Sequence, residues 1–155
     1  MSVTDIPVAR AEPRLDPRGV RFAAALTTVV LALVLVSGSG WLAAAQAAVF
    51  AVGRFAGMQF APYGELYRRL VARRLGPATA WEDAAPVRFS QTVGLVFTAV
   101  AAAGYLGGLP LLGVVATAAA LAAAFLNAAF GFCLGCEMYG LLARLRGSGS
   151  LPARS

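Results

Sequence analysis

Two long segments of this chain contain no basic residue, and this absence constrains the fold more than any other feature. Arginine supplies every basic side chain, and no arginine falls within residues 22–53 or 89–143. Glu137 is the only carboxylate in the two segments. Stretches this long and this apolar belong in a lipid bilayer, and the overall composition agrees, with 59% hydrophobic and 13% charged residues. The sequence therefore predicts a single all-α integral membrane domain.

Turn-forming residues divide the apolar sequence into about four predicted transmembrane helices, arranged as two hairpins. Ser37-Gly38-Ser39-Gly40 separates the first pair, and Gly107-Gly108-Leu109-Pro110 separates the second. The predicted spans, within a membrane domain at 22–146, are 22–37, 41–57, 89–106 and 110–143. Each arm of the first hairpin has about 16 residues, enough for a thin span of about 24 Å. A cleaved signal peptide is the alternative for the first run, but the apolar sequence continues past any cleavage site.

The last apolar run, Leu111 to Leu142, is too long for one simple span. As a continuous helix it would measure about 48 Å, against a hydrocarbon core of about 30 Å. Either this helix protrudes far into the cytoplasm, or it breaks near Asn127 to Gly131 and a second short helix follows. Both arrangements leave the two cysteines near the cytoplasmic side.

Between the hairpins, residues 62–75 predict a basic amphipathic helix on the inner membrane surface. Its apolar face begins with Tyr63 and Leu66, and anionic lipid accounts for its arginines, which are Arg68, Arg69, Arg73 and Arg74. A docking helix for a soluble partner is the alternative. Residues 1–21 are expected to form a polar cytoplasmic arm, and residues 147–155 a flexible tail.

The predicted topology places all 13 basic residues on the cytoplasmic side, with both termini there. The lipid bilayer is then the main partner, and no nucleic-acid partner is expected because the arginines do not alternate with aromatic residues along one face. Heavy use of alanine, glycine and arginine without lysine is typical of a GC-rich bacterial genome. The predicted location is therefore a bacterial plasma (inner) membrane.

The Cys133-x-x-Cys136 pair, followed by Glu137, is the candidate catalytic group. Such a pair can cycle between dithiol and disulfide, transfer sulfur, or bind a soft metal. Redox chemistry requires a thiolate, which a helix N-terminus favours. A chain that restarts its helix at Gly131 would place Cys133 in that position, and Glu137 could accept a thiol proton. Metal binding through the two thiols is the weaker alternative, because the chain has no histidine, and no cofactor is predicted.

A packing role for the same segment is the competing interpretation. Gly131 and Gly135 form a small-xxx-small pair that permits close approach of another helix. Asn127 and Gly140 complete the predicted helix-packing set, and the cysteines would then be small buried residues. A non-catalytic membrane subunit or anchor, or a homo-oligomer, would follow. Transport is not favoured, because Gln91 and Asn127 are weak as a polar pathway without paired charges.

The segment Phe130-Gly131-Phe132-Cys133-Leu134-Gly135-Cys136-Glu137 resembles the signature of an uncharacterised bacterial membrane family, domain of unknown function family 4395. The segments Asp16-Pro17-Arg18, Pro62-Tyr63-Gly64 and Glu82-Asp83-Ala84-Ala85-Pro86 are also similar to that family. The resemblance covers about residues 16–146. It implies a small membrane protein of about four spans and supplies no activity.

The leading hypothesis is a membrane thiol protein. Cys133 and Cys136 would exchange electrons or sulfur with a soluble thioredoxin-like or rhodanese-like protein, and Glu137 would assist proton transfer. The arginine-rich surface would receive that partner. The partner class follows only from the chemistry of a dithiol beside a basic surface.

Overall fold

The described part of the protein is all-helical apart from one short antiparallel pairing, which confirms the predicted all-α class. The computed structural model describes residues 14–57, 60–76 and 81–147. Its helices are α1 (Pro17–Ser37), α2 (Gly40–Phe55), α3 (Pro62–Tyr67), the π-helical turn η2 (Arg68–Ala72), α4 (Arg73–Leu75), α5 (Ala84–Leu106), α6 (Pro110–Phe130) and α7 (Leu134–Gly147). Two strands of two residues, β1 (Arg14–Leu15) and β2 (Glu82–Asp83), pair antiparallel. Most of the predicted polar arm and all but the first residue of the predicted tail lie outside the described residues.

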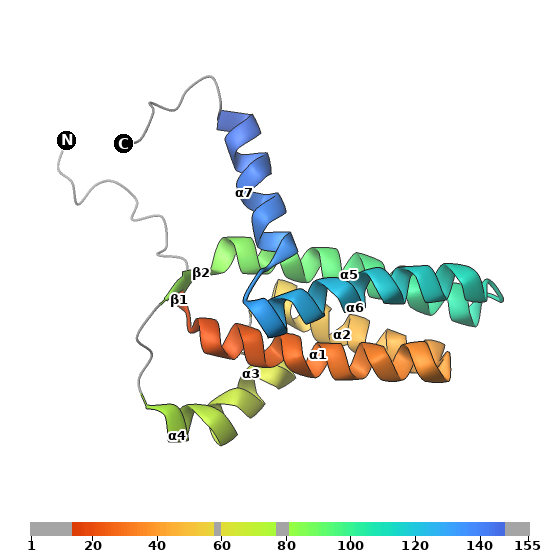
Figure 1. The fold of residues 1–155 in the computed structure, drawn as a ribbon, viewed down its shortest axis with the longest axis horizontal. Helices are drawn as coiled ribbons and strands as arrows, with labels where there is room; N and C mark the ends of the chain where they lie inside the picture. The colour runs from red at the N-terminus through yellow and green to blue at the C-terminus, as the bar shows by residue number, and fades with distance from the viewer. Residues whose placement is uncertain (1–13, 58–59, 77–80, 148–155) are drawn as a thin grey trace.

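Helices α1, α2, α5 and α6 lie side by side as a bundle, and the stretch from α3 to α4 and helix α7 lie outside it toward one end (Figure 1). Helix α2 packs mainly on α5, and α1 packs mainly on α6. The two hairpins are therefore joined by contacts across the bundle. We call the end with the two short turns, at residues 38–39 and 107–109, the turn end. The opposite end, where α1 and α5 begin, is called the foot.

Three helices of the described chain are long and apolar enough to cross a membrane: Pro17–Ser37, Ala84–Leu106 and Pro110–Phe130. Helix α2 has 16 residues, and it is shorter than these three. The first and third of the predicted spans begin earlier than expected, at Pro17 and Ala84 rather than at residues 22 and 89. For α1 the reason is local, since Asp16 caps the helix and Pro17 suits its first position.

Small side chains close the turn end of the bundle. Its buried core consists of Val34, Ala43, Ala101, Ala102 and Ala116, one or two from each of the four helices. Alanine-rich helix faces let the backbones approach closely, because no larger side chain holds them apart. The foot has a different interior, which is described with the site below.

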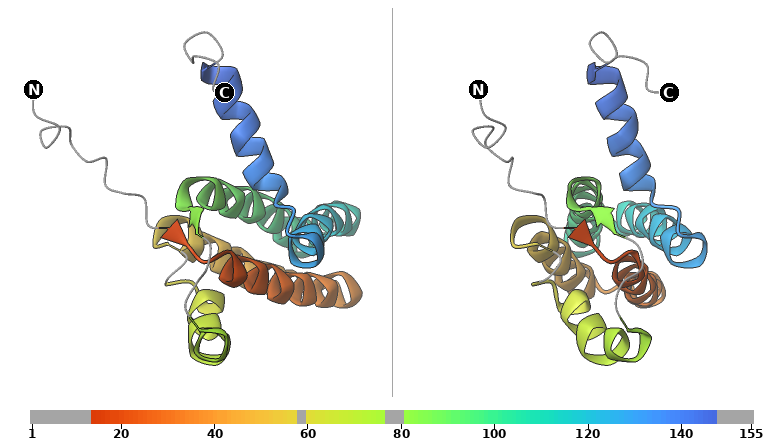
Figure 2. Two further views of the ribbon diagram at one scale, coloured as in Figure 1. Left: turned by 60° about the vertical axis from the view of Figure 1, so that its left-hand side comes forward. Right: turned by 90° about the vertical axis from the view of Figure 1, so that its left-hand side faces the viewer.

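The short helices α3, η2 and α4 form one continuous helical stretch over residues 62–75, and hydrogen bonds attach it to α2 and to the start of α1. Tyr67 donates from its hydroxyl to Asp16 Oδ2 at 2.8 Å, and Tyr63 donates to Gln46 Oε1 at 2.6 Å. Arg18 pairs with Asp16 and donates to the carbonyl of Gly76 at 3.1 Å. Figure 2 shows the stretch on the side of the bundle opposite α7.

Replacing Asp16 by alanine is expected to lower the stability of the protein by about 2 kcal/mol or more. The change removes the cap of α1 and leaves the hydroxyl of Tyr67, a residue only 4% exposed, without its acceptor. Asp16→Asn keeps a capping side chain and is expected to cost less. Unfolding of the purified protein in mixed detergent micelles measures both. Equal stability of Asp16→Ala and the unchanged protein would contradict this account.

The stability of the protein should depend on pH through the carboxylate of Asp16. Burial raises the pKa of Asp16, but hydrogen bonds from Arg18 and Tyr67 outweigh this and hold the pKa below its ordinary value. A lowered pKa means that the stabilisation is complete above the ordinary value of about 3.9 and is lost as pH falls below it. The stability difference between the unchanged protein and Asp16→Asn should therefore shrink on acidification below about pH 4.

Candidate functional site

The long apolar run of the sequence is broken at Gly131, so the structure has the second of the two arrangements that the sequence allowed. Gly131 ends α6 in the left-handed region with φ of 68°, which glycine adopts without strain. Its N–H donates to the Asn127 carbonyl at 2.9 Å, and Phe132 N–H donates to the Leu126 carbonyl at 3.3 Å. These bonds close the helix as a glycine C-cap does. Helix α7 then begins at Leu134 and runs across the direction of the bundle (Figure 1).

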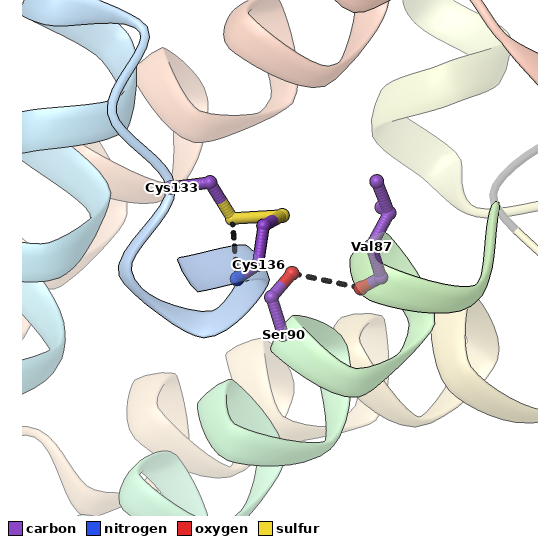
Figure 3. The surroundings of a disulfide bond; sticks show 4 residues. All are labelled: Val87, Ser90, Cys133 and Cys136. Carbon is purple, nitrogen blue, oxygen red and sulfur yellow. Dashed lines mark hydrogen bonds between the residues drawn. A yellow bond between two sulfur atoms is a disulfide. The ribbon is translucent and has the colours of Figure 1, made fainter. Parts of the chain in front are cut away.

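Cys133 occupies the N-cap position of α7. Its sulfur accepts a hydrogen bond from the Cys136 N–H at 3.2 Å, and its carbonyl accepts one from the Glu137 N–H at 3.0 Å. The sulfurs of Cys133 and Cys136 are joined as a disulfide, with the Cα atoms 5.2 Å apart (Figure 3). Both side chains are half-buried. The pair therefore lies at a helix N-terminus, where free N–H groups and the helix dipole favour a negative sulfur.

Arg21 of α1 holds the end of α6 just before the cysteines. Its guanidinium donates to the carbonyls of Ala128 and Ala129 at 3.2 and 3.4 Å, and Gly131 lies beside it. A cation at a helix C-terminus satisfies carbonyls that have no partner within the helix. Arg21 thus fixes the position from which the chain turns into α7.

Replacing Arg21 by glutamine is expected to loosen this turn without unfolding the bundle. The loss of a charged donor at two partly exposed carbonyls should cost about 1 kcal/mol, and the effect should be local. Hydrogen exchange should rise at residues 128–133 and stay unchanged in the alanine core at the turn end. Arg54→Gln, which removes a charge from the end of α2, is the matched control. Equal exchange in both variants would argue against the role of Arg21.

Gly135 seats α7 against α5. A Cβ atom at this position would overlap Ser90 and lie 2.6 Å from its Cα, so only glycine fits. The rings of Phe89 and Tyr139 meet nearby, with centroids 5.9 Å apart. Figure 3 shows Cys136 at the start of α7, next to the turn of α5 that carries Ser90. The contact between α5 and α7 therefore sets where the disulfide lies.

A cavity of about 310 Å³ occupies the foot half of the bundle, and Cys133 is part of its wall. Alanines and other apolar side chains of α1, α5 and α6 form most of the lining, with Phe50 from α2. The polar residues among the described lining are Thr27, Tyr63, Ser90, Gln91, Asn127 and Cys133. Cys136 does not line it. The two sulfurs therefore have different surroundings, one on the cavity and one outside it.

The predicted site residues are only partly brought together. Glu137 lies in the first turn of α7 with its side chain exposed, and no contact joins its carboxylate to either sulfur among the described residues. Asn127 lines the cavity, where packing had been expected. Gly131 and Gly135 do not form one helical face, because the break lies between them. A Cβ at Gly140 would meet nothing within 4 Å.

The amphipathic stretch at 62–75 has the polar surface that the sequence indicated. Glu65 pairs with Arg68 and with Arg69, the latter at 2.7 Å, and these hydrogen bonds lower the pKa of Glu65. Arg73 and Arg74 are exposed. Within residues 14–57, 60–76 and 81–147, no three side chains of His, Cys, Asp or Glu gather as a metal site would need.

Sequence reasoning missed Arg21, Tyr63 and Ser90 as parts of the site. Arg21 directly precedes the first apolar run, and nothing in the sequence indicates that it contacts the end of a helix more than a hundred residues later. In the sequence, Ser90 is one polar residue near the start of a predicted helix. Its role in the site follows only from the close approach of Gly135 in the structure. These contacts are tertiary, and residue spacing alone does not reveal them.

Comparison with known proteins gives a family and no activity. A profile of the family described as "Domain of unknown function (DUF4395)" matches residues 15–144, which include both cysteines and the helices that position them. No curated protein matches the chain, and no solved structure matches it.

Proposed function

This chain belongs to the DUF4395 family, a domain of unknown function, and we propose that it is a membrane thiol oxidoreductase that uses Cys133 and Cys136. The observation that carries the proposal is the position of the pair at the N-terminus of α7. A cysteine there can leave or attack as a thiolate, since the N–H of Cys136 and the helix dipole stabilise the negative sulfur. A cysteine that serves only to fill space needs no such position.

The proposal places the site at the inner surface of a bacterial plasma membrane. Helix α2, although short, would be the fourth span, with Arg54 at its end reaching the interface. All described arginines then lie at or beyond the foot of the bundle, as the positive-inside rule requires. Both termini would be cytoplasmic. Helix α7 would lie along the membrane surface, with Leu141 and Leu145 exposed for lipid contact.

A soluble thioredoxin-like protein would be the partner, drawn to the exposed arginines of the foot. Its thiolate attacks the Cys136 sulfur, and the S–S bond breaks with Cys133 as the leaving thiolate. The partner's second thiolate then attacks the mixed disulfide and releases Cys136. The partner becomes a disulfide, and two electrons and two protons remain on Cys133 and Cys136. Attack at Cys136 is favoured because Cys133 is the better leaving group and faces the cavity.

Trapping with single-cysteine variants tests this proposal. In Cys133→Ser no internal thiol competes, so Cys136 attacks the disulfide form of the soluble protein and releases one of its two sulfurs as a thiolate. Rapid acid quenching of the cells should preserve this mixed disulfide before the released thiolate reverses the step. Cys136→Ser leaves only the sulfur that lines the cavity, which a small alkylating reagent can reach but a folded protein cannot approach as closely, so this variant should trap about tenfold less. The double variant is the control. Equal capture by the double variant and by Cys133→Ser would mean that the cysteines take no part. A rhodanese-like partner would be identified from the same captured adduct.

A non-catalytic anchor is the second candidate, and one observation favours it. The surface of α7 at Gly140 is open, with room for a close helix of another chain, whereas Gly135 is already occupied by Ser90 of the same chain. Substitution at Gly140 should then disrupt assembly and leave thiol chemistry intact.

A further inference from the structure

The cavity beside Cys133 has a volume in the lower part of the range for small-molecule sites, which hold ligands in about 300–1,000 Å³. It is confined to the foot half, because alanines fill the turn half. The ring of Phe50 and the side chain of Phe97 form part of its wall, and Tyr63 from α3 contributes from the foot. The space therefore lies between the helices, with Cys133 as part of its wall.

The chemistry of the lining restricts what the cavity can hold. No charged side chain is among the described residues that line it, so a nucleotide or any other phosphate-bearing cofactor would lose its hydration without a cation to replace it. The ligand must be largely apolar. It must also accept hydrogen bonds at a few points, because two amides face the same space.

Gln91 of α5 and Asn127 of α6 are those amides. Both line the cavity, both are half-buried, and the structure gives neither side chain a hydrogen-bond partner among the described residues. Their N–H groups are therefore available as donors on the cavity wall, and a ligand with carbonyl oxygens would accept hydrogen bonds from them. Two donors on different helices fit a ligand with carbonyls at separated positions.

We propose that the cavity binds a membrane quinone, which accepts the electrons of Cys133 and Cys136. A quinone is an apolar ring with two carbonyl acceptors, and it takes two electrons and two protons, which is what one dithiol releases. This inference rests on the proposed thiol function and names its electron acceptor.

The transfer balances in two steps. The Cys133 thiolate attacks a carbonyl carbon of the quinone, which needs no unsubstituted ring position, and forms an S–C bond. The Cys136 thiolate then attacks the Cys133 sulfur, forming the disulfide and breaking the S–C bond, whose electron pair stays on the ring. The two protons of the original thiols complete the quinol. Cys133 is the attacking sulfur because it alone of the pair lines the cavity.

The test uses 2,3-dimethyl-1,4-naphthoquinone, which has no free quinone ring position for adventitious thiol addition, and the pre-reduced full-length protein in lipid nanodiscs. One quinol should form for each disulfide, measured by quinone absorbance and by thiol content. Binding is measured separately with the oxidised protein by equilibrium dialysis. The hydrocarbon 2,3-dimethylnaphthalene, which lacks the carbonyls, should bind at least about tenfold more weakly.

Paired variants separate the cavity from the rest of the bundle. Ala123→Leu fills the cavity and should abolish quinone binding, whereas Ala122→Leu places the same side chain on the neighbouring exposed position and should not. Gln91→Leu and Asn127→Leu keep the space but remove one donor, and each should weaken binding about five- to tenfold. Melting temperatures of all four variants identify any that fail to fold, and the remaining amide variant then decides.

The thiol-exchange and quinone experiments together distinguish failure of this inference from failure of the proposed function. A pair that exchanges with a soluble dithiol but neither binds nor reduces the quinone would overturn this inference and leave the thiol function standing. A pair that exchanges with no dithiol would overturn the proposed function. Equal binding of the hydrocarbon and the quinone would show that the cavity does not recognise the carbonyl groups, and this result would also overturn the inference.

Discussion

With Cys136 replaced by serine, Cys133 is expected to be alkylated at pH 7 at least about tenfold faster than Cys136 in the Cys133→Ser variant. The reason is the position of each sulfur on α7. Cys133 sits at the N-cap and receives the Cys136 N–H, whereas Cys136 lies one turn into the helix. Only the thiolate reacts, so the rate reports how strongly each site stabilises the negative sulfur.

The measurement is the alkylation rate of each single-cysteine protein between pH 5 and pH 10, in detergent and in nanodiscs. Cys133 should reach half its maximal rate below about pH 8.5, the ordinary value for a thiol. Comparing the maximal rates at high pH controls for burial, because accessibility limits the plateau and not the midpoint. If both single-cysteine proteins reach half their maximal alkylation rate at the same pH, at or above about 8.5, then the N-terminus of α7 does not stabilise the Cys133 thiolate.

Replacing Gly135 by leucine is expected to have the largest structural effect of any single change at the site, about 1–3 kcal/mol or more. Even a Cβ atom overlaps Ser90, and Ser90 contributes backbone as well as side chain to the contact, so α7 must move away from α5. Gly140→Leu is the matched control, since nothing lies within 4 Å of its added Cβ. It is on the same helix and receives the same side chain.

Stability in mixed micelles and the accessibility of the reduced cysteines measure this pair of variants. Gly135→Leu should melt earlier and expose Cys133 to a bulky alkylating reagent, while Gly140→Leu should match the unchanged protein in both. A reversed order, with Gly140→Leu the more disruptive, would favour the anchor that packs through α7 on another chain.

Much of the architecture follows from residue patterns that are local. Asp16-Pro17 predicts a helix start, glycine-rich turns predict hairpins, and the absence of arginine from two segments predicts helices in a membrane. The excessive length of the last apolar run also predicted that it needs a break or a protrusion. Hydrogen bonds within a few residues determine these features, so the sequence carries them directly.

The site depends on contacts that spacing does not encode. From the sequence, the cysteines could lie near the C-terminal end of one long helix or at the N-terminus of a second helix. The left-handed conformation of Gly131 and the contact of Arg21 with the end of α6 produce the second arrangement. The sequence offered Glu137, next to Cys136, as a proton acceptor for the thiols, but its side chain is exposed in the structure and no contact joins it to either sulfur among the described residues. The cavity arises from how small side chains of four helices meet, which no single segment shows.

Thiol trapping of the unchanged protein tests the central claim most directly. Cys133 and Cys136 would be alkylated in intact cells and in purified membranes, before and after reduction, and their oxidation state read from the mass shift. The account predicts a pair that is partly disulfide in cells, becomes dithiol with a thioredoxin-type reductant, and returns to disulfide when that reductant is withdrawn. Two thiols that stay reduced and unreactive under every condition would contradict it.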